Sequence, residues 1–285
     1  MTRTIQTVGV VGLGTMGAGI AQIAVLAGND VVGREVSEDL NEKARGRIDH
    51  FLGRAVEKGR LDAAAKDAAV GRLRTTTDLA ELAACDLVIE AIVEELEPKR
   101  ELFAELDRIC APDAILATNT SALSVTEIAE STQRPGRVIG MHFFNPAPVL
   151  PLVEIVRTEH SDAVAVDAAY AWAERAGKRP VRCNDTPGFI VNRILIPLLN
   201  DCVRVLDEAD VTPEDLDKAM TNGAGWPMGP CALVDLVGID IHVHASAALH
   251  GKLGEPRLAP PERLLAMQAE GKLGRKSGEG FYRYE

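Results

Sequence analysis

In the N-terminal part of the chain, short β-branched runs alternate with longer amphipathic segments. The short runs predict strands at 5–11, 30–33, 86–90, 114–118, 137–142, 152–156 and 180–183. The longer segments predict helices at 15–27, 38–58, 97–110 and 162–176. Because strands that alternate with helices are typical of βα units, this part predicts an α/β fold with a doubly wound, mostly parallel sheet of the Rossmann type.

The strand pattern stops at Asp185-Thr-Pro-Gly188. The run that follows has the length of a helix and is apolar on nearly every face. Helices are predicted from there on at 189–208, 213–221, 230–250 and 261–270, before a Gly/Lys-rich tail. We therefore expect two domains, an α/β domain over 1–184 and an all-α C-terminal domain over 185–285, which suits a chain of 285 residues.

Composition and charge narrow the class of partner. The net charge of −11 repels phosphates and anionic lipids, and only 4% of residues are aromatic, so we expect neither nucleic-acid nor membrane binding. The N-terminus shows no signal segment and no apolar stretch has membrane-spanning length, which predicts a cytoplasmic protein. Its five cysteines are widely spaced without a C-x-x-C pair, so we expect reduced thiols and no metal site.

A glycine-rich loop follows the first predicted strand and opens a helix rich in small residues. The first two glycines of a G-x-G-x-x-G pattern permit a tight turn whose N–H groups reach a pyrophosphate, and the third allows close helix packing. Glu35 ends the next predicted strand, where an acidic side chain hydrogen-bonds the ribose hydroxyls of NAD. We expect the dinucleotide loop to comprise Gly12, Gly14, Thr15, Met16 and Gly17.

The same acidic residue bears on the choice of cofactor. Glu35 would repel the 2′-phosphate of NADP, whereas the adjacent Arg34 softens that preference. The sequence therefore predicts NAD and leaves NADP open.

A second candidate centre is the histidine at the end of predicted strand 137–142, at the sheet edge where ligands of open α/β sheets bind. Oxidation of an alcohol needs a base for the hydroxyl proton, and a histidine side chain titrates in the right range. A lone histidine there is more often structural. Glu154 changes this balance, because a carboxylate within Leu152-Val-Glu-Ile-Val156 is costly to bury without a partner such as the imidazolium of His142.

Polar residues elsewhere have two interpretations each. Asn192 lies in an apolar helical run, where its amide bonds either a structural partner or a substrate carbonyl. Asn119-Thr-Ser121 follows predicted strand 114–118, so its side chains either face the sheet edge beside His142 or cap a helix.

A basic island interrupts the acidic surface. Arg54 and Lys58 are four residues apart, so they share one helix face and are able to grip the phosphates of a large anionic handle. Such a run is usually only a solvated face. The island consists of Lys43, Arg45, Arg47, Arg54, Lys58 and Arg60.

Taken together, these residues resemble the L-3-hydroxyacyl-CoA dehydrogenases, particularly the short single-function bacterial 3-hydroxybutyryl-CoA dehydrogenases. The resemblance covers essentially the full length. Its most specific segments are Gly12-Leu-Gly-Thr-Met-Gly-Ala-Gly-Ile-Ala21, Glu90-Ala-Ile-Val-Glu94, Thr118-Asn-Thr-Ser121, His142-Phe-Phe-Asn-Pro146, Asp185-Thr-Pro-Gly-Phe-Ile-Val-Asn-Arg193 and Gly274-Arg-Lys-Ser-Gly-Glu-Gly-Phe-Tyr282.

The resemblance implies roles for individual residues. It implies that His142 is the catalytic base, that Glu154 orients it, and that Ser121 and Asn192 hold the reacting end of the substrate. It implies an acyl-CoA substrate whose CoA moiety meets Arg54 and Lys58. The cofactor contacts implied beyond the glycine loop and Glu35 are Glu94, Lys99, Asn119, Asn145 and Lys276.

The implied reaction is reversible, NAD-dependent oxidation of a short-chain 3-hydroxyacyl-CoA to the 3-ketoacyl-CoA. The family architecture further implies a homodimer formed through the C-terminal helical domain. Two positions depart from the family pattern, because Gly33-Arg34 stands where bulkier apolar residues are common and Arg54 replaces a lysine.

Two other functions remain open from the sequence. A related 3-hydroxy-acid dehydrogenase for free acids such as gulonate would share the dinucleotide fold and the histidine, but Arg54 and Lys58 favour the CoA enzyme. A non-catalytic NAD-binding protein would keep the glycines without needing His142 and Glu154 together.

Overall fold

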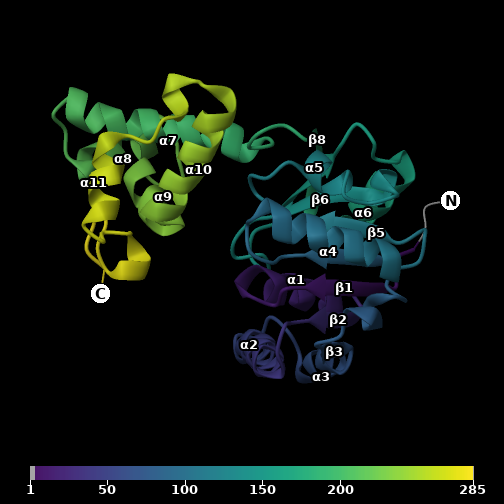
Figure 1. The fold of residues 1–285 in the computed structure, drawn as a ribbon. Helices are drawn as coiled ribbons and strands as arrows, with labels where there is room; N and C mark the ends of the chain where they lie inside the picture. The colour runs from purple at the N-terminus through teal and green to yellow at the C-terminus, as the bar shows by residue number, and fades with distance from the viewer. Residues whose placement is uncertain (1–3, 285) are drawn as a thin grey trace. The chain divides into compact units, whose positions relative to one another are not determined.

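A computed structural model describes residues 4–284, and the chain divides into two compact units between Thr186 and Pro187. Each unit has its own buried hydrophobic clusters. The first unit contains every strand of the described sheet, and the second is helical (Figure 1).

The first unit is built on one sheet with strand order β3-β2-β1-β4-β5-β6-β7-β8. All neighbouring strands pair in parallel except β6 and β7, which are antiparallel. Strand order reverses at β1, so a crevice forms at the carboxyl ends of β1 and β4. The strands are β1 Thr7–Val11, β2 Asp30–Arg34, β3 Leu73–Thr76, β4 Leu87–Glu90, β5 Ile115–Thr118, β6 Val138–Phe143, β7 Leu152–Arg157 and β8 Arg179–Asn184.

Helices cover both faces of this sheet. Alternate residues of one strand enter different cores, since Leu87 and Ile89 of β4 pack on one face and Val88 on the other. The first face is covered by α1 Thr15–Leu26, α2 Glu38–Glu57, α3 Ala63–Gly71 and α6 Ala163–Arg175, and the second by α4 Leu96–Ile109 and α5 Val125–Ala129. The Rossmann-type, mostly parallel α/β prediction is therefore confirmed.

The segment between α2 and β4 contains two elements that the sequence pattern does not reveal. Helix α3 buries only Ala69, so it lacks an apolar stripe, and it begins where Asp62 accepts a hydrogen bond from Ala65 N. Strand β3 reads Leu-Arg-Thr-Thr at the sheet edge. An edge strand buries less than a central one, so it carries a weaker hydrophobic signal.

The second unit consists of α7 Val191–Glu208, α8 Pro213–Gly223, α9 Pro230–Val237, α10 Ile239–Leu253 and α11 Glu262–Ala269. The single helix predicted over 230–250 is wrong. Gly238 has φ of +102°, which no right-handed helix accommodates, and α9 and α10 meet there at 94°. No single described helix is long and apolar enough to span a membrane, and α9 with α10 satisfy the length and composition criteria only as this bent pair.

Candidate functional site

The glycine loop joins β1 to α1 at the crevice. Gly12 has φ of +83°, and a Cβ there would lie 2.7 Å from the carbonyl oxygen of Ala91. A Cβ on Gly17 would lie 1.7 Å from the carbonyl oxygen of Gly12. Both positions therefore exclude any side chain, and the main chain at the start of α1 is open to an anionic ligand.

Glu35 lies directly against this loop. Its Oε1 accepts a hydrogen bond from Leu13 N at 2.6 Å, and its Oε2 accepts one from Val36 N at 3.2 Å. A cavity of about 580 Å³ at the ends of β1, β2 and β4 is lined by Glu35, Arg34, Gly12 and Gly14. This is the carboxylate that the sequence predicts to hydrogen-bond the adenosine ribose of NAD. Its place beside the glycine loop is compatible with that prediction.

A buried ion-pair network lies beside the crevice. Lys99 of α4 is 1% exposed, and its Nζ lies 2.5 Å from Glu90 Oε1 and 3.3 Å from Glu94 Oε2. Glu90 also accepts hydrogen bonds from Thr118 Oγ1 at 2.7 Å and Ile92 N at 2.7 Å. The Lys99 ammonium is thus held between two carboxylates, which fixes the loop after β4.

Glu94 links this network to the segment after β5. Its Oε1 accepts hydrogen bonds from Thr120 Oγ1 and from Ser121 N, both at 2.7 Å, and from Ser121 Oγ at 3.2 Å. Burial opposes ionisation of Glu94, but Lys99 and these donors outweigh it and hold the pKa of the Glu94 carboxyl below its usual value. The anionic Glu94 therefore orients Ser121.

His142 and Glu154 are cross-strand partners in the antiparallel pair β6–β7. His142 Nδ1 lies 2.7 Å from Glu154 Oε2, and the carboxylate is fully buried. In the tautomer whose Nδ1–H donates to the carboxylate, Nε2 is the ring nitrogen that accepts a proton. Asn119 supports the same strand, since its Oδ1 accepts a hydrogen bond from Phe143 N at 3.0 Å.

A larger cavity of about 690 Å³ lies between α1, α2 and the loop that follows β6. Arg54 and Lys58 both line it, together with the exposed Phe51 of α2 and Asn145 of the loop. Arg47 and Arg60 add to its positive charge. Arg45 turns away instead, pairing with Glu38 and Thr75.

Two predicted site residues belong to the second unit. Asn192 lies in the first turn of α7. Lys276 Nζ pairs with Asp240 of α10, with nitrogen–oxygen distances of 2.5 and 2.6 Å. The structure thus brings His142, Glu154, Asn119, Glu94 and Ser121 into one connected region of the first unit, whereas Asn192 and Lys276 are fixed within the second.

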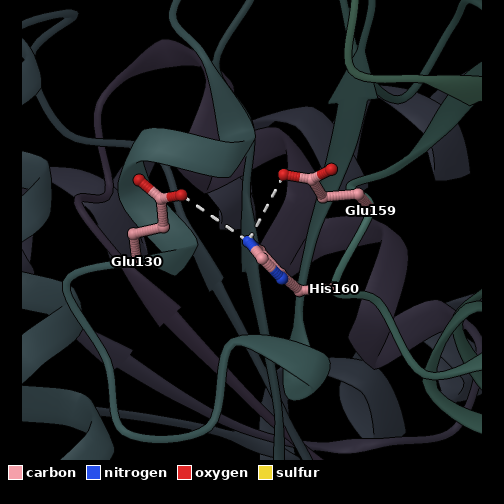
Figure 2. Close-up of side chains that lie close together, drawn as sticks. All are labelled: Glu130, Glu159 and His160. Carbon is pink, nitrogen blue, oxygen red and sulfur yellow. Dashed lines mark ion pairs between the residues drawn. The ribbon is translucent and has the colours of Figure 1, made fainter.

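One cluster of possible metal ligands occurs among residues 4–284, where Glu130 at the end of α5 meets Glu159 and His160 of the turn after β7 (Figure 2). His160 Nε2 lies 3.6 Å from Glu130 Oε1 and 3.8 Å from Glu159 Oε1, and all three side chains are substantially exposed. Exposed pairs at such distances contribute at most about 1 kcal/mol. We treat the cluster as surface ion pairs, and the expectation of no metal stays a prediction.

Sequence reasoning overlooked Glu90 and Thr118 as site residues. Glu90 carried a detectable signal, because it is the one charged residue that ends the apolar run Leu87–Glu90. Its partner lies nine residues later on α4, where a lysine near a helix start resembles a surface residue.

Comparison with known proteins agrees with this geometry. Residues 7–186 match the family model for the NAD-binding domain of 3-hydroxyacyl-CoA dehydrogenase, and residues 188–284 match the C-terminal domain of that enzyme. A 3-hydroxybutyryl-CoA dehydrogenase from Mycobacterium tuberculosis (strain ATCC 25618 / H37Rv) is 46% identical, with 100% of both chains covered. One from Clostridioides difficile is 40% identical over 96% of this chain and 98% of its own.

A solved structure is similar over the whole chain. The crystal structure of (S)-3-hydroxybutyryl-CoA dehydrogenase from Ralstonia eutropha has a TM-score of 0.95 and 39% identity, covering 99% of this chain and 100% of that one. The glycine loop, the acid at the second strand and the His142–Glu154 pair thus occur in a chain that matches both domains of one enzyme family. This protein is an NAD-dependent oxidoreductase and belongs to the 3-hydroxyacyl-CoA dehydrogenase family.

Proposed function

We propose that this protein catalyses the reversible oxidation of a short-chain 3-hydroxyacyl-CoA, such as 3-hydroxybutyryl-CoA, to the 3-ketoacyl-CoA. The observation that carries the proposal is the 2.7 Å contact between His142 Nδ1 and the buried Glu154 carboxylate. It leaves Nε2 as a base at the sheet edge where the family's substrate reacts. The named relatives act on 3-hydroxybutyryl-CoA, which favours a short acyl chain.

In the proposed mechanism His142 Nε2 takes the proton from the substrate's 3-hydroxyl group. NAD⁺, held by the residues of the glycine loop, would supply the acceptor for the hydride that leaves C3 of the substrate. Glu154 stabilises the imidazolium that forms, and in the reverse direction His142 returns the proton to the carbonyl oxygen. Ser121, held by Glu94, and Asn192 orient the carbonyl and hydroxyl groups of the substrate.

The proposed cofactor site is the glycine loop with Glu35. The main chain at Gly12 and Gly14 would hold the pyrophosphate, with Thr15, Met16 and Gly17 completing the turn. Asn119, Asn145, Glu94 and Lys276 are proposed as further contacts. Lys99, with its ammonium buried between two carboxylates, would act through Glu94.

The 690 Å³ cavity is the proposed site of the CoA handle. Arg54 and Lys58 supply the positive charge that phosphates require, while the exposed Phe51 ring offers an apolar contact. A free hydroxy acid would use none of these groups.

We also propose a homodimer formed through the second unit. An apolar groove there is lined by Leu195, Leu198, Trp226, Pro227, Met228, Leu233 and Leu236, and Leu236 is 49% exposed. Exposed apolar surface of this kind marks protein interfaces. Light scattering on the purified protein tests this, and a monomer at micromolar concentration would refute it.

A cytoplasmic location is proposed from the thiols. All five cysteines are free, and burial raises the pKa of each thiol. Four of these cysteines are buried and Cys183 is partly buried, and free thiols shielded in this way suit a reducing compartment. Cell fractionation followed by immunoblotting would test the location.

Oxidation of NADH with a panel of acceptors tests the proposed reaction. We expect turnover of acetoacetyl-CoA, a smaller kcat/KM for longer 3-ketoacyl-CoAs, and little rate with free acetoacetate. Repeating the assay with NADPH measures cofactor preference. Activity confined to free acetoacetate would reject the CoA assignment.

A further inference from the structure

The loop Asn145–Pro151 carries the chain from β6 to β7, and so from His142 to Glu154. Three of its seven residues are prolines, which have no N–H to donate. Val149 N and Leu150 N both donate to the carbonyl oxygen of Pro146, at 3.0 Å each. Other carbonyls of the loop therefore need donors from elsewhere.

Lys178 supplies them. Its Nζ donates to the carbonyl oxygens of Ala147 at 2.5 Å and Leu150 at 3.0 Å. The residue is only 8% exposed, and burial lowers the pKa of its ammonium. A buried ammonium is costly unless its donors are satisfied, so these two bonds hold both the lysine and the loop.

The backbone places Lys178 for this contact. The residue follows α6, where Gly177 with φ of +75° ends the helix and Lys178 N donates to Ala173 O at 2.9 Å. The next residue starts β8, and Arg179 N donates to Pro151 O at 2.7 Å. The lysine is thus fixed between a helix end and the strand that borders β7.

The opposite side of the loop is packed closely. A Cβ on Gly19 of α1 would lie 3.0 Å from Pro148 Cδ and 3.2 Å from Ala147 Cβ. Residues 145–149 of the loop face Arg54 and Lys58 across the 690 Å³ cavity. Lys178 therefore holds the loop that forms one wall of that cavity, through hydrogen bonds to the loop's main chain.

We propose that Lys178 is a positioning residue that holds the Asn145–Pro151 loop as a wall of the substrate groove. The inference rests on the proposed function only for the identity of the ligand, a CoA thioester. Removing the ammonium leaves two carbonyls without donors and releases the wall. His142 and Glu154 keep their pairing, because it belongs to the β6–β7 ladder. Binding of the CoA thioester should suffer more than the chemical step.

Replacement of Lys178 by methionine, which keeps the length but removes all donors, tests this. In K178M we expect the KM for acetoacetyl-CoA to rise about tenfold, as loss of hydrogen bonds to a charged group predicts, with kcat within about threefold of wild type. K178R keeps the donors and should recover part of the affinity. K218M removes a lysine from exposed α8 and should leave both constants unchanged.

Several results would overturn the proposal. One is a folded K178M with wild-type KM, even if its melting temperature is lower, because that would be a purely structural role. Another is a fall in kcat at constant KM. If K178M does not fold, K178Q is measured in the same way and should show a raised KM.

Different results would refute the proposed reaction and the proposed role of Lys178. Lack of acetoacetyl-CoA turnover by the wild-type protein would reject the reaction. Calorimetric titration with CoA itself still measures the affinity of the 690 Å³ cavity for its ligand. K178M should bind CoA at least about fivefold more weakly than wild type. Equal CoA affinity in K178M and wild type would refute the proposal that Lys178 holds the Asn145–Pro151 loop in place for binding.

Discussion

His142 and Glu154 face each other across the antiparallel ladder of β6 and β7, with Nδ1 and Oε2 2.7 Å apart. The pairing depends on strand register, because a shift of one residue would turn Glu154 to the other face of the sheet. The carboxylate is fully buried, so its contact with Nδ1 orients the imidazole ring, as the proposed base requires.

Replacing Glu154 by glutamine should lower kcat about 100-fold, because the amide keeps the shape but not the charge that stabilises the imidazolium. The pH dependence of kcat should change and NAD affinity should not. Steady-state kinetics and NADH fluorescence titration measure these effects. E159Q on the exposed turn after β7 is the control, and wild-type kinetics in E154Q would contradict the dyad.

Glu35 should govern cofactor preference. In E35A, loss of the carboxylate against the glycine loop should weaken NADH binding about tenfold and improve the relative use of NADPH, since the charge no longer repels a 2′-phosphate. The ratio of kcat/KM for the two cofactors measures this. E38Q, on the exposed start of α2, serves as the control. An unchanged ratio would show that the adenosine ribose of the cofactor does not bind beside Glu35.

Lys99 should be essential for stability. Methionine there leaves the buried Glu90 carboxylate without its cation, and removal of one partner of a buried ion pair typically costs about 3–5 kcal/mol. Urea denaturation monitored by circular dichroism measures the free energy of unfolding. K66M breaks a more exposed pair with Asp49 and should cost less than about 1 kcal/mol. An equal loss of unfolding free energy in both variants would show that burial of the Lys99–Glu90 pair does not increase its contribution to stability.

Arg54 and Lys58 should act on the CoA handle alone. Replacing both by alanine should raise the KM for acetoacetyl-CoA about tenfold or more, through loss of charge-assisted contacts to phosphate. The KM for a short acetoacetyl thioester that lacks the nucleotide should stay the same. Arg45, which pairs with Glu38, provides the control variant R45A. Equal effects on both thioesters would show that the CoA moiety does not bind in this cavity.

His242 should make the second unit acid-sensitive. Its Nε2 donates to Asn200 Oδ1 at 2.8 Å, and burial lowers the pKa of the imidazole to about 4. The unfolded state binds the proton near pH 6.5, so stability is full above that value and falls as pH drops toward 4, by about 3 kcal/mol. Unfolding of wild type and H242Q across this range measures the effect, and parallel curves would refute it.

The sequence alone indicates the fold because its signals are local. The β-branched runs, the glycine loop and the acid at the end of the second strand all act over a few residues, and each lies where the structure has it. Gly238 was also readable as a break, but its apolar neighbours on both sides suggested one continuous helix over 230–250. Weakly apolar α3 and β3 gave no such signal.

Contacts between distant segments could not be predicted in the same way. Glu94 lies 27 residues before Ser121, and Lys178 lies 31 residues after Ala147, so no periodicity connects either pair. Whether a charged side chain is buried, and against what, depends on which strands become neighbours.

The sequence by itself therefore determined the α/β and helical domains, the dinucleotide loop and the candidate base His142. The sequence also offered Glu154 as the partner of His142. Only the tertiary structure decided that β6 and β7 run antiparallel, which sets the register of that pair, and that Lys99 is buried between Glu90 and Glu94. The physical reason is that backbone propensity and glycine geometry are properties of short segments. The partner of a buried charge is set by strand order and register, which belong to the whole sheet.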